Sequence, residues 1–128
     1  MRTIKFRGKK LHNGNWVCGY LTDVDNTPIG KVGIINSKPF SGCEESSMVI
    51  AETIGQFTGL YDKNGKEIYE GDIVSIEAIK SRINKVVEWN SERACWDAGG
   101  ENRIELYAFY HCEVIGNIYD NEELLTQN

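Results

Sequence analysis

The sequence is poor in proline and has no long hydrophobic run. Only two of its 128 residues are proline, whereas 13 are glycine and 13 are aromatic. No apolar stretch approaches the roughly 18 residues that a membrane-spanning helix requires. The opening residues, MRTIKFRGKK, lack the apolar segment of a secretory signal. We therefore expect a cytoplasmic protein with no membrane partner, built from short strands and tight turns.

The cysteines form no recognisable metal or disulfide pattern. Cys18, Cys43, Cys95 and Cys112 include no CxxC pair and match no zinc finger or ribbon. An even number permits disulfides, but free, buried thiols are the better interpretation for a chain without a signal peptide. His111 precedes Cys112 in a predicted strand, so their side chains should point to opposite faces. The pattern thus predicts no metal and no cofactor.

The remaining composition is that of an ordinary globular domain. Hydrophobic residues make up 41% of the chain and charged residues 26%, which argues against disorder. A chain of this length buries roughly two-thirds of its unfolded surface without needing disulfides or metals. We expect one domain over residues 1–128, with a subdivision into residues 1–56 and 57–128 as the alternative.

Charge is unevenly distributed along the chain. The 14 Lys and Arg residues and 19 Asp and Glu residues give a net charge of −5. Residues 1–20 nevertheless contain five basic residues and no acidic one, so the rest of the chain carries −10. The net negative charge argues against general nucleic-acid binding, whereas the basic segment can mark a face for nucleic acid or for an acidic partner.

Alternating hydrophobic and polar residues predict short β-strands along most of the chain. The clearest runs are residues 4–7, 16–21, 72–76, 85–89, 104–110 and 113–119. Residues 22–48 are less regular, and we expect loop there except for one strand near residues 31–35. Residues 48–56 are compatible with either helix or strand.

Two Asn-Gly pairs predict tight hairpin turns. Asn13-Gly14 and Asn64-Gly65 each separate two strand-like runs, as a two-residue type I′ turn would, with positive φ at both positions. In the second hairpin this turn would place Tyr61 opposite Ile68. Gly71-Asp72 marks a further turn that leads into an alternating strand, an arrangement with which many SH3-like barrels begin.

These signals together predict a mainly β fold of antiparallel hairpins. We expect an irregular β region over residues 1–56 and an SH3-like small barrel over residues 57–128. A short C-terminal helical turn should close the chain, because Asp120 precedes Glu123 by the spacing of a capping box variant. Leu124 and Leu125 would then pack back onto the barrel.

Three stretches of the chain also carry a family pattern. They read IKFRG and GNWVCGY within residues 4–20, QFTGLYDKNGKEIYEGDIV at residues 56–74, and EVIGNIYDN followed by a helical turn within residues 113–125. In these stretches the chain resembles the YopX family of phage and prophage proteins. The resemblance implies a small, mostly β protein that acts in a bacterial host cell, and it supplies no catalytic residues.

Enzymatic activity finds little support among the residues. His12 lies beside a predicted turn, where a solvated side chain is the simpler interpretation. Glu67, Glu70 and Asp72 form the closest acidic cluster, but Glu70 can bind backbone donors and Asp72 can face solvent or cap its turn. Motifs of hydrolases, P-loop proteins and dinucleotide-binding proteins are absent from the sequence. We predict no catalytic residues.

Basic and aromatic side chains near the N-terminus form the candidate binding site. The candidate contacts are Lys5, Arg7, Lys9, Lys10, Trp16 and Tyr20. In a strand, Lys5 and Arg7 would share the solvent face, opposite Ile4 and Phe6. A solvated edge strand, protected by its charges from aggregation, accounts for the same residues.

Two classes of function are compatible with this site. A β-rich chain with exposed strand edges and an acidic surface favours a protein-interaction or self-assembly module, whose partner is a second copy or a host or phage protein. The alternative is a small barrel that binds nucleic acid through the basic strand and its aromatic neighbours. An enzyme is a distant third interpretation.

Overall fold

The computed structural model describes residues 4–28, 30–37, 46–77, 82–98, 104–105 and 112–126. The chain forms two compact units that divide between Phe57 and Thr58. We call the N-terminal part unit 1 and the C-terminal part unit 2. Strand β5 (Gly55–Tyr61) begins in unit 1 and ends in unit 2.

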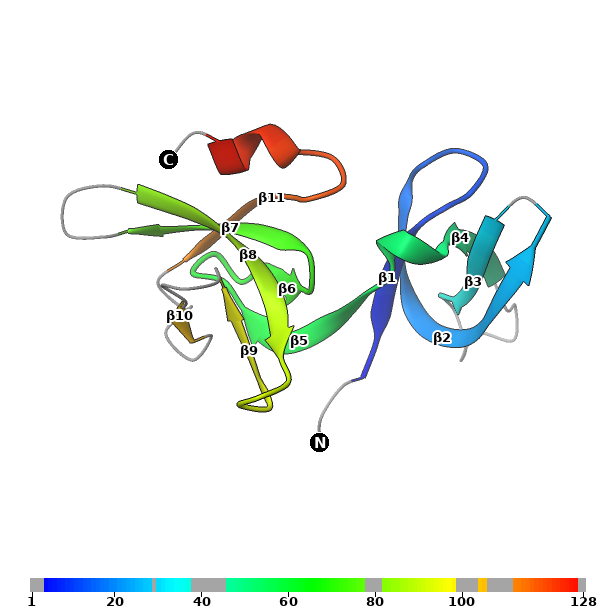
Figure 1. Cartoon of the computed structure of the whole chain (residues 1–128), viewed down its shortest axis with the longest axis horizontal. Coiled ribbons are helices and arrows are strands. Elements are labelled where there is room, and N and C mark those ends of the chain that lie inside the picture. The colour runs from blue at the N-terminus through cyan, green and yellow to red at the C-terminus, as the bar shows by residue number, and fades with distance from the viewer. Residues whose placement is uncertain are drawn as a thin grey trace. The chain divides into compact units, whose positions relative to one another are not determined.

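Unit 1 is an antiparallel sheet in which the chain runs back and forth before returning to its first strand (Figure 1). Its elements are β1 (Phe6–Lys9), β2 (Trp16–Thr27), β3 (Gly30–Asn36), β4 (Ser46–Ile50), the 3-10 turn η1 (Ala51–Thr53) and the start of β5. The strand order is β4-β3-β2-β1-β5. A bridge between Lys10 and Val49 and a hydrogen bond from Leu11 N–H to the Met48 carbonyl (2.9 Å) join β4 back to the end of β1.

The closed arrangement of unit 1 surrounds a small apolar core. The side chains of Ile35 and Val49 are completely buried. They meet beside Gly8, where an added Cβ would lie 2.9 Å from the Val49 side chain and 3.3 Å from Ile35 Cδ1. The inward face of β1 therefore points into this core, which leaves its other face for the candidate site.

The long hairpin of β2 and β3 corrects the prediction of mainly loop between residues 22 and 48. That prediction is wrong for residues 22–27, which lie in β2, and for residues 46–48, which lie in β4. Only β3 was expected there, over residues 31–35. The far end of β2 carries exposed polar side chains, so it shows no hydrophobic alternation although β3 pairs with it as far as Thr27.

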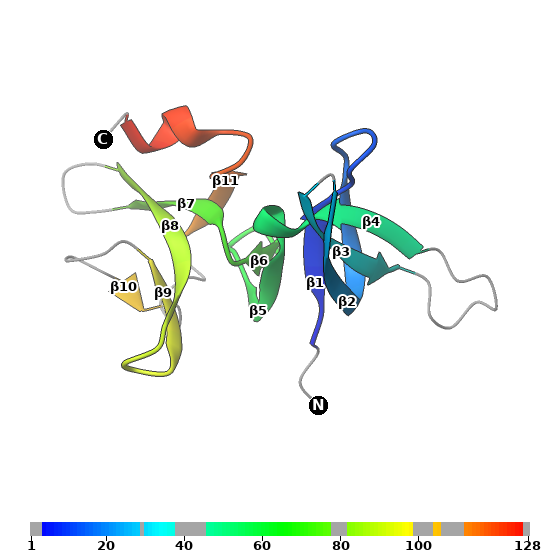
Figure 2. The same cartoon turned by 45° about the vertical axis from the view of Figure 1, so that its right-hand side comes forward.

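Unit 2 repeats the strand order of unit 1. Its elements are the end of β5, β6 (Glu67–Tyr69), β7 (Asp72–Glu77), β8 (Arg82–Asn90), β9 (Cys95–Ala98), β10 (Ile104–Glu105), β11 (Glu113–Asn117) and the 3-10 turn η4 (Glu122–Thr126). In the order β10-β9-β8-β7-β11, the first strand of the meander, β7, pairs both with β8 and with β11, the last strand of the chain, as β1 pairs with β2 and β5. Figure 2 shows β7 (green) beside β8 and β11 (orange). The fold prediction of a mainly β protein with antiparallel hairpins is confirmed.

The core of unit 2 is larger than that of unit 1. It consists of buried side chains from β6, β7, β8, β9 and β11 and from the residue before β11, namely Ile68, Val74, Val87, Trp96, Ala98, Cys112 and Val114. Val87 lies on β8 opposite Ala98 on β9, and Trp96 faces Trp89 across the same hairpin. The two tryptophan rings meet edge to face at 5.1 Å, a geometry that adds to the stabilisation from burial.

Both Asn-Gly turns occur where expected, but their type differs from the prediction. In the first, Lys10 N–H binds the Asn15 carbonyl (2.8 Å), so residues 11–14 form a four-residue loop. Only Gly14 has positive φ (72°), whereas a type I′ turn would also require it at Asn13. The Asn13 side chain accepts the Asn15 N–H instead (2.9 Å).

The second hairpin has a three-residue loop. Asp62 N–H binds the Lys66 carbonyl (2.8 Å), and Gly65 has a φ of 81°. The additional loop residue changes which side chains share a face, because side chains alternate along a strand. Tyr61 is 52% exposed and Ile68 is fully buried, so the predicted pairing of these two residues is wrong.

The turn at Gly71-Asp72 is held by a buried carboxylate. Asp72 is only 1% exposed, and its Oδ2 accepts the Tyr69 N–H at 2.8 Å. Of the two roles predicted for Asp72, the structure therefore has the turn cap and not the solvent-facing side chain. The turn positions the start of β7, whose residues 72–75 are all buried.

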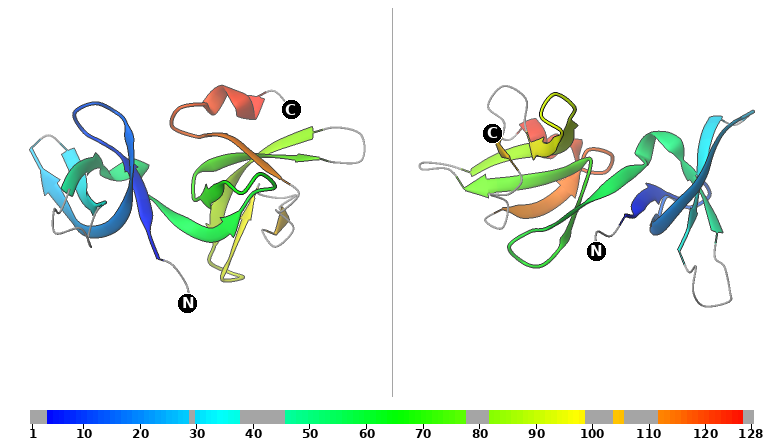
Figure 3. Two further views of the ribbon diagram at one scale, coloured as in Figure 1. Left: turned by 180° about the vertical axis from the view of Figure 1, so that it is seen from behind. Right: turned by 90° about the horizontal axis from the view of Figure 1, so that it is seen from below.

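The C-terminal helical turn is confirmed as η4, and Figure 3 shows it (red) beside the strands of unit 2. Its Leu124 carbonyl accepts a hydrogen bond from Asn84 Nδ2 (2.9 Å) on β8. Asp120 is not its N-cap, however, because η4 begins at Glu122 and the Asp120 carboxylate accepts from Asn117 Nδ2 (3.2 Å). Asn117 also accepts the N–H groups of Tyr119 and Asp120, both at 2.9 Å.

Three predictions lie partly or wholly outside the described residues. They concern Cys43, the orientation of His111 and the strand at residues 106–110. The other three cysteines have free thiols, of which Cys112 is buried, Cys95 is half-buried and Cys18 is exposed. The expectation of buried thiols is therefore wrong for Cys18. Within the described ranges no helix is both long and apolar enough to cross a membrane.

Candidate binding face

The outer face of β1 and β2 carries most of the residues predicted as contacts. Lys9 pairs with Trp16 and Arg7 with Cys18, and residues paired in this way share one face of the sheet. Alternation adds Lys5, the residue before β1, and Tyr20 on β2. Phe57 on β5 joins them, since its N–H binds the Lys5 carbonyl at 2.9 Å. We call these residues the basic face: Lys5, Arg7, Lys9, Trp16, Cys18, Tyr20 and Phe57.

Each cation of the basic face lies over an aromatic ring. The Arg7 guanidinium carbon is 4.7 Å from the centre of the Trp16 ring, and Lys9 Nζ is 5.9 Å from the same ring. Lys5 Nζ is 5.0 Å from the centre of the Phe57 ring. Cation–π contacts at these distances are worth about 0.5–1 kcal/mol each at exposed sites. They hold three positive charges in fixed positions along one strand.

Exposure differs across the basic face. Lys5, Arg7, Lys9 and Trp16 are half-buried, and the Nε and Nη2 atoms of Arg7 are buried. Cys18 is exposed, and Tyr20 is 46% exposed. Phe57 is 3% exposed, so its ring acts as a support for Lys5 rather than as a contact surface. The two most accessible residues of the face, Cys18 and Tyr20, therefore lie on β2.

Lys10 is the predicted contact that lies elsewhere. It follows β1 and forms the bridge with Val49, at the junction with β4. Phe57 and Cys18, in contrast, belong to the basic face without having been predicted. Strand alternation could have revealed Cys18, whereas Phe57 reaches the face only through the pairing of β1 with β5, about 50 residues further along the chain.

The two units differ strongly in formal charge. Unit 1 contains 7 Lys and Arg and 5 Asp and Glu residues, which gives +2, whereas unit 2 contains 7 and 14, which gives −7. Two acidic residues of unit 1, Asp23 and Asp25, lie in the far part of β2. The negative charge of Asp23 raises the pKa of the Asp25 carboxyl above its usual value.

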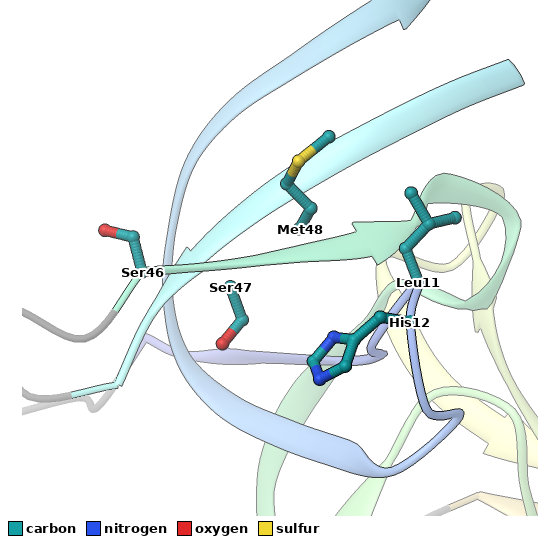
Figure 4. A pocket seen from close by; sticks show the side chains of 5 residues that line it. All are labelled: Leu11, His12, Ser46, Ser47 and Met48. Carbon is teal, nitrogen blue, oxygen red and sulfur yellow. The ribbon is translucent and has the colours of Figure 1, made fainter. Parts of the chain in front are cut away.

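A shallow pocket of about 260 Å³ lies where the first hairpin loop meets β4. Leu11 and His12 from the first hairpin loop line it together with Ser46, Ser47 and Met48, and Figure 4 shows Leu11 and Met48 on one side of β4 and His12 and Ser47 on the other. His12 is exposed. Within the described ranges no three His, Cys, Asp or Glu side chains come close enough together to hold a metal ion.

Two buried ionisable groups of unit 2, Asp62 and Cys112, have shifted pKa values. Asp62 is 5% exposed and accepts the N–H groups of Asn64, Lys66 and Val114, each at 2.9 Å. Burial raises its pKa, but these three hydrogen bonds outweigh burial and hold the pKa below its usual value. Burial, followed by the charge of Asp62, raises the pKa of the Cys112 thiol to about 12. Asp62 stabilises the fold because it ties the second hairpin to β11, and the Cys112 side chain is part of the core of unit 2.

Comparison with known proteins identifies the family. The crystal structure of protein EF1440 from Enterococcus faecalis is similar, with 26% sequence identity and a TM-score of 0.60, and the match covers 98% of this chain and 99% of EF1440. No curated protein matches the sequence. The family model described as YopX protein matches residues 5–126, which is nearly the whole chain. The chain therefore belongs to the YopX family.

Proposed function

We propose that this protein is a non-enzymatic phage or prophage accessory protein that binds an acidic protein segment through the basic face. It acts in the cytoplasm of the bacterial host. The observation that supports this function is the row of three cations formed by Lys5 and by Arg7 and Lys9 of β1, each held over an aromatic ring of a neighbouring strand. Side chains held in this way have little conformational freedom left to lose on binding, which favours affinity.

The surroundings of the row favour a protein partner. Tyr20 is an exposed aromatic side chain next to the cations, and tyrosine and arginine are enriched at protein interfaces. The row itself contains no acidic residue. An acidic segment with an apolar or aromatic side chain would complement both features.

Nucleic acid is the second candidate ligand, and the same row of cations is the observation in its favour. Proteins that bind single strands stack bases on open aromatic rings. The Phe57 ring is almost fully buried, and Arg7 and Lys9 lie over the Trp16 ring. Two of the three aromatic rings near the row are thus already engaged by protein cations. The net charge of −5 also opposes a polyanion.

The strand order supports an SH3-like barrel for residues 57–128, and we extend this proposal to unit 1. In both units the first strand of a meander also pairs with the last strand. In unit 1 a 3-10 turn precedes that last strand. SH3-like barrels carry many unrelated functions, so the functional argument rests on the basic face and not on the fold.

Site-specific photo-crosslinking in bacterial cells that carry the source prophage tests the proposal. Benzoylphenylalanine in place of Tyr20 should give a discrete crosslinked protein product, because position 20 lies beside the cations and is exposed. The product should disappear when Lys5 and Lys9 are both changed to Glu. Tyr61, which is 52% exposed in unit 2, is the matched control position and should give no such product.

Three outcomes would contradict the proposal. Equal protein crosslinking from positions 20 and 61, or none from either, would remove the basic face as a protein-binding surface. Crosslinking of position 20 to nucleic acid would transfer the function to the second candidate.

A further inference from the structure

We infer that the acidic segment bound by the basic face is the C-terminal segment Tyr119–Glu123 of a second copy of this chain. The inference rests on the proposed function and names its partner. Tyr119, Asp120, Glu122 and Glu123 are all exposed. Three carboxylates and one aromatic ring therefore lie within five residues. The carboxylates are opposite in charge to the three cations of the basic face, and the ring of Tyr119 can pack against that of Tyr20.

The acidic segment is fixed in its position on unit 2. Asn117 accepts the N–H groups of Tyr119 and Asp120 at 2.9 Å, and the Asn121 N–H binds the Asn117 carbonyl at the same distance. On its other side, Asn84 Nδ2 binds the Leu124 carbonyl at 2.9 Å. The carboxylates thus project from a backbone that is already ordered, so binding costs less conformational entropy than it would for a flexible segment.

The charges of the two units favour this association over contacts between two like surfaces. Unit 1 carries +2 and unit 2 carries −7. Contacts between two copies of unit 2, or between two basic faces, bring like charges together. A contact between the basic face of one copy and the acidic segment of another pairs opposite charges. Such a contact joins two different surfaces of the chain, so two copies can close into a reciprocal dimer and more copies can form rings or chains.

Sedimentation of the full-length protein at increasing concentration tests this inference. Between about 10 and about 300 µM the average mass should rise above that of the monomer at about 50 mM NaCl. It should return to the monomer mass at about 500 mM NaCl, where screening shortens the range of the charges to a few ångström. The salt comparison needs no variant and is independent of any folding defect.

Two charge-reversal variants separate the two surfaces. One carries Lys5→Glu with Lys9→Glu, and the other carries Glu122→Lys with Glu123→Lys. Each variant alone should remain monomeric, because each lacks one half of the contact. An equal mixture should associate again, because the intact basic face of one variant meets the intact acidic segment of the other, and the two reversed surfaces are also opposite in charge.

A matched control keeps the change in net charge but moves it elsewhere. Glu88 and Glu92 are exposed residues of β8 and the turn that follows it. The variant with Glu88→Lys and Glu92→Lys has the same charge as the reversed acidic segment and should associate as the wild type does.

The outcomes distinguish this inference from the proposed function. Monomers at every concentration, or association that survives both reversals, would overturn the inference. If position 20 still crosslinks to another protein in cells, the binding function stands with a different partner. If it crosslinks to nothing, both proposals fail.

Discussion

Replacing Asp62 by alanine is expected to lower the free energy of unfolding by about 3–5 kcal/mol, because it leaves three backbone N–H groups without their acceptor. Those groups belong to Asn64 and Lys66 in the second hairpin and to Val114 on β11. Val114 and Asp62 are 52 residues apart in the chain, so the hydrogen bond between them joins the first hairpin of unit 2 to its last strand, β11. Urea denaturation followed by circular dichroism measures the change.

The control for Asp62 is a nearby exposed carboxylate. Glu113 forms an ion pair with Lys63 at 3.8 Å, with both side chains about 40% exposed. Exposed pairs of this kind contribute about 0–1 kcal/mol, so Glu113→Ala should have a small effect. Similar unfolding curves for the two variants would refute the structural role of Asp62.

The pH dependence of the same variant gives an independent check. The folded protein holds the pKa of Asp62 below the usual 3.8, so the ionised carboxylate stabilises the fold above that value. This contribution is lost as the pH falls through the lowered pKa and the folded protein also becomes protonated. The difference in stability between wild type and Asp62→Ala should therefore be constant near neutral pH and narrow below about pH 4. A difference that grows on acidification would contradict the sign of the shift.

Replacing Gly19 by alanine is expected to cost about 2–4 kcal/mol through steric overlap. A Cβ at this position of β2 would overlap the carbonyl oxygen of Asn36 on β3, and it would lie 2.8 Å from the Asn36 carbonyl carbon and 2.9 Å from the Ser37 Cα. All three atoms belong to the backbone and cannot move aside as a side-chain end could. Thermal unfolding provides the measurement.

Gly14→Ala isolates conformational strain from this overlap. Gly14 has a φ of 72°, and a Cβ there would meet no atom within 4 Å. The expected cost is about 1 kcal/mol, from the left-handed backbone conformation alone. If Gly14→Ala is as destabilising as Gly19→Ala, the close approach of β2 and β3 is not the cause.

Local patterns in the sequence predicted the elements whose faces differ in polarity. β7, β8 and β11 have one face in the core of unit 2, and their alternating residues predicted them. Residues 22–26 at the far end of β2 are all exposed and show no such pattern, so the pairing of this segment with β3 could not be predicted from the sequence. The Asn-Gly pairs indicated both hairpins but not the lengths of their loops. The three-residue loop of the second hairpin sets the strand register, which leaves Tyr61 exposed and Ile68 buried.

The candidate site divides in the same way. Lys5, Arg7 and Lys9 share a face because side chains alternate, a local property of one strand. The register of β1 with β2 then brings Trp16 to Lys9. The ring beneath Lys5 belongs to Phe57, and only the fold brings these two residues together. The covering of aromatic rings by cations, which weighs against base stacking, was likewise not predictable from composition or spacing.

The measurement that tests the function most directly is a titration of the full-length protein with single-stranded and duplex oligonucleotides at several salt concentrations. We expect no salt-sensitive binding of either, because the protein carries −5 and two rings of the basic face are already occupied by cations. The contradictory result is micromolar affinity that falls with salt at a log–log slope of about −3 to −4, as four phosphate contacts would produce. Loss of that binding on neutralising Lys5, Arg7, Lys9 and Lys10 would assign nucleic acid, and not an acidic protein segment, to this surface.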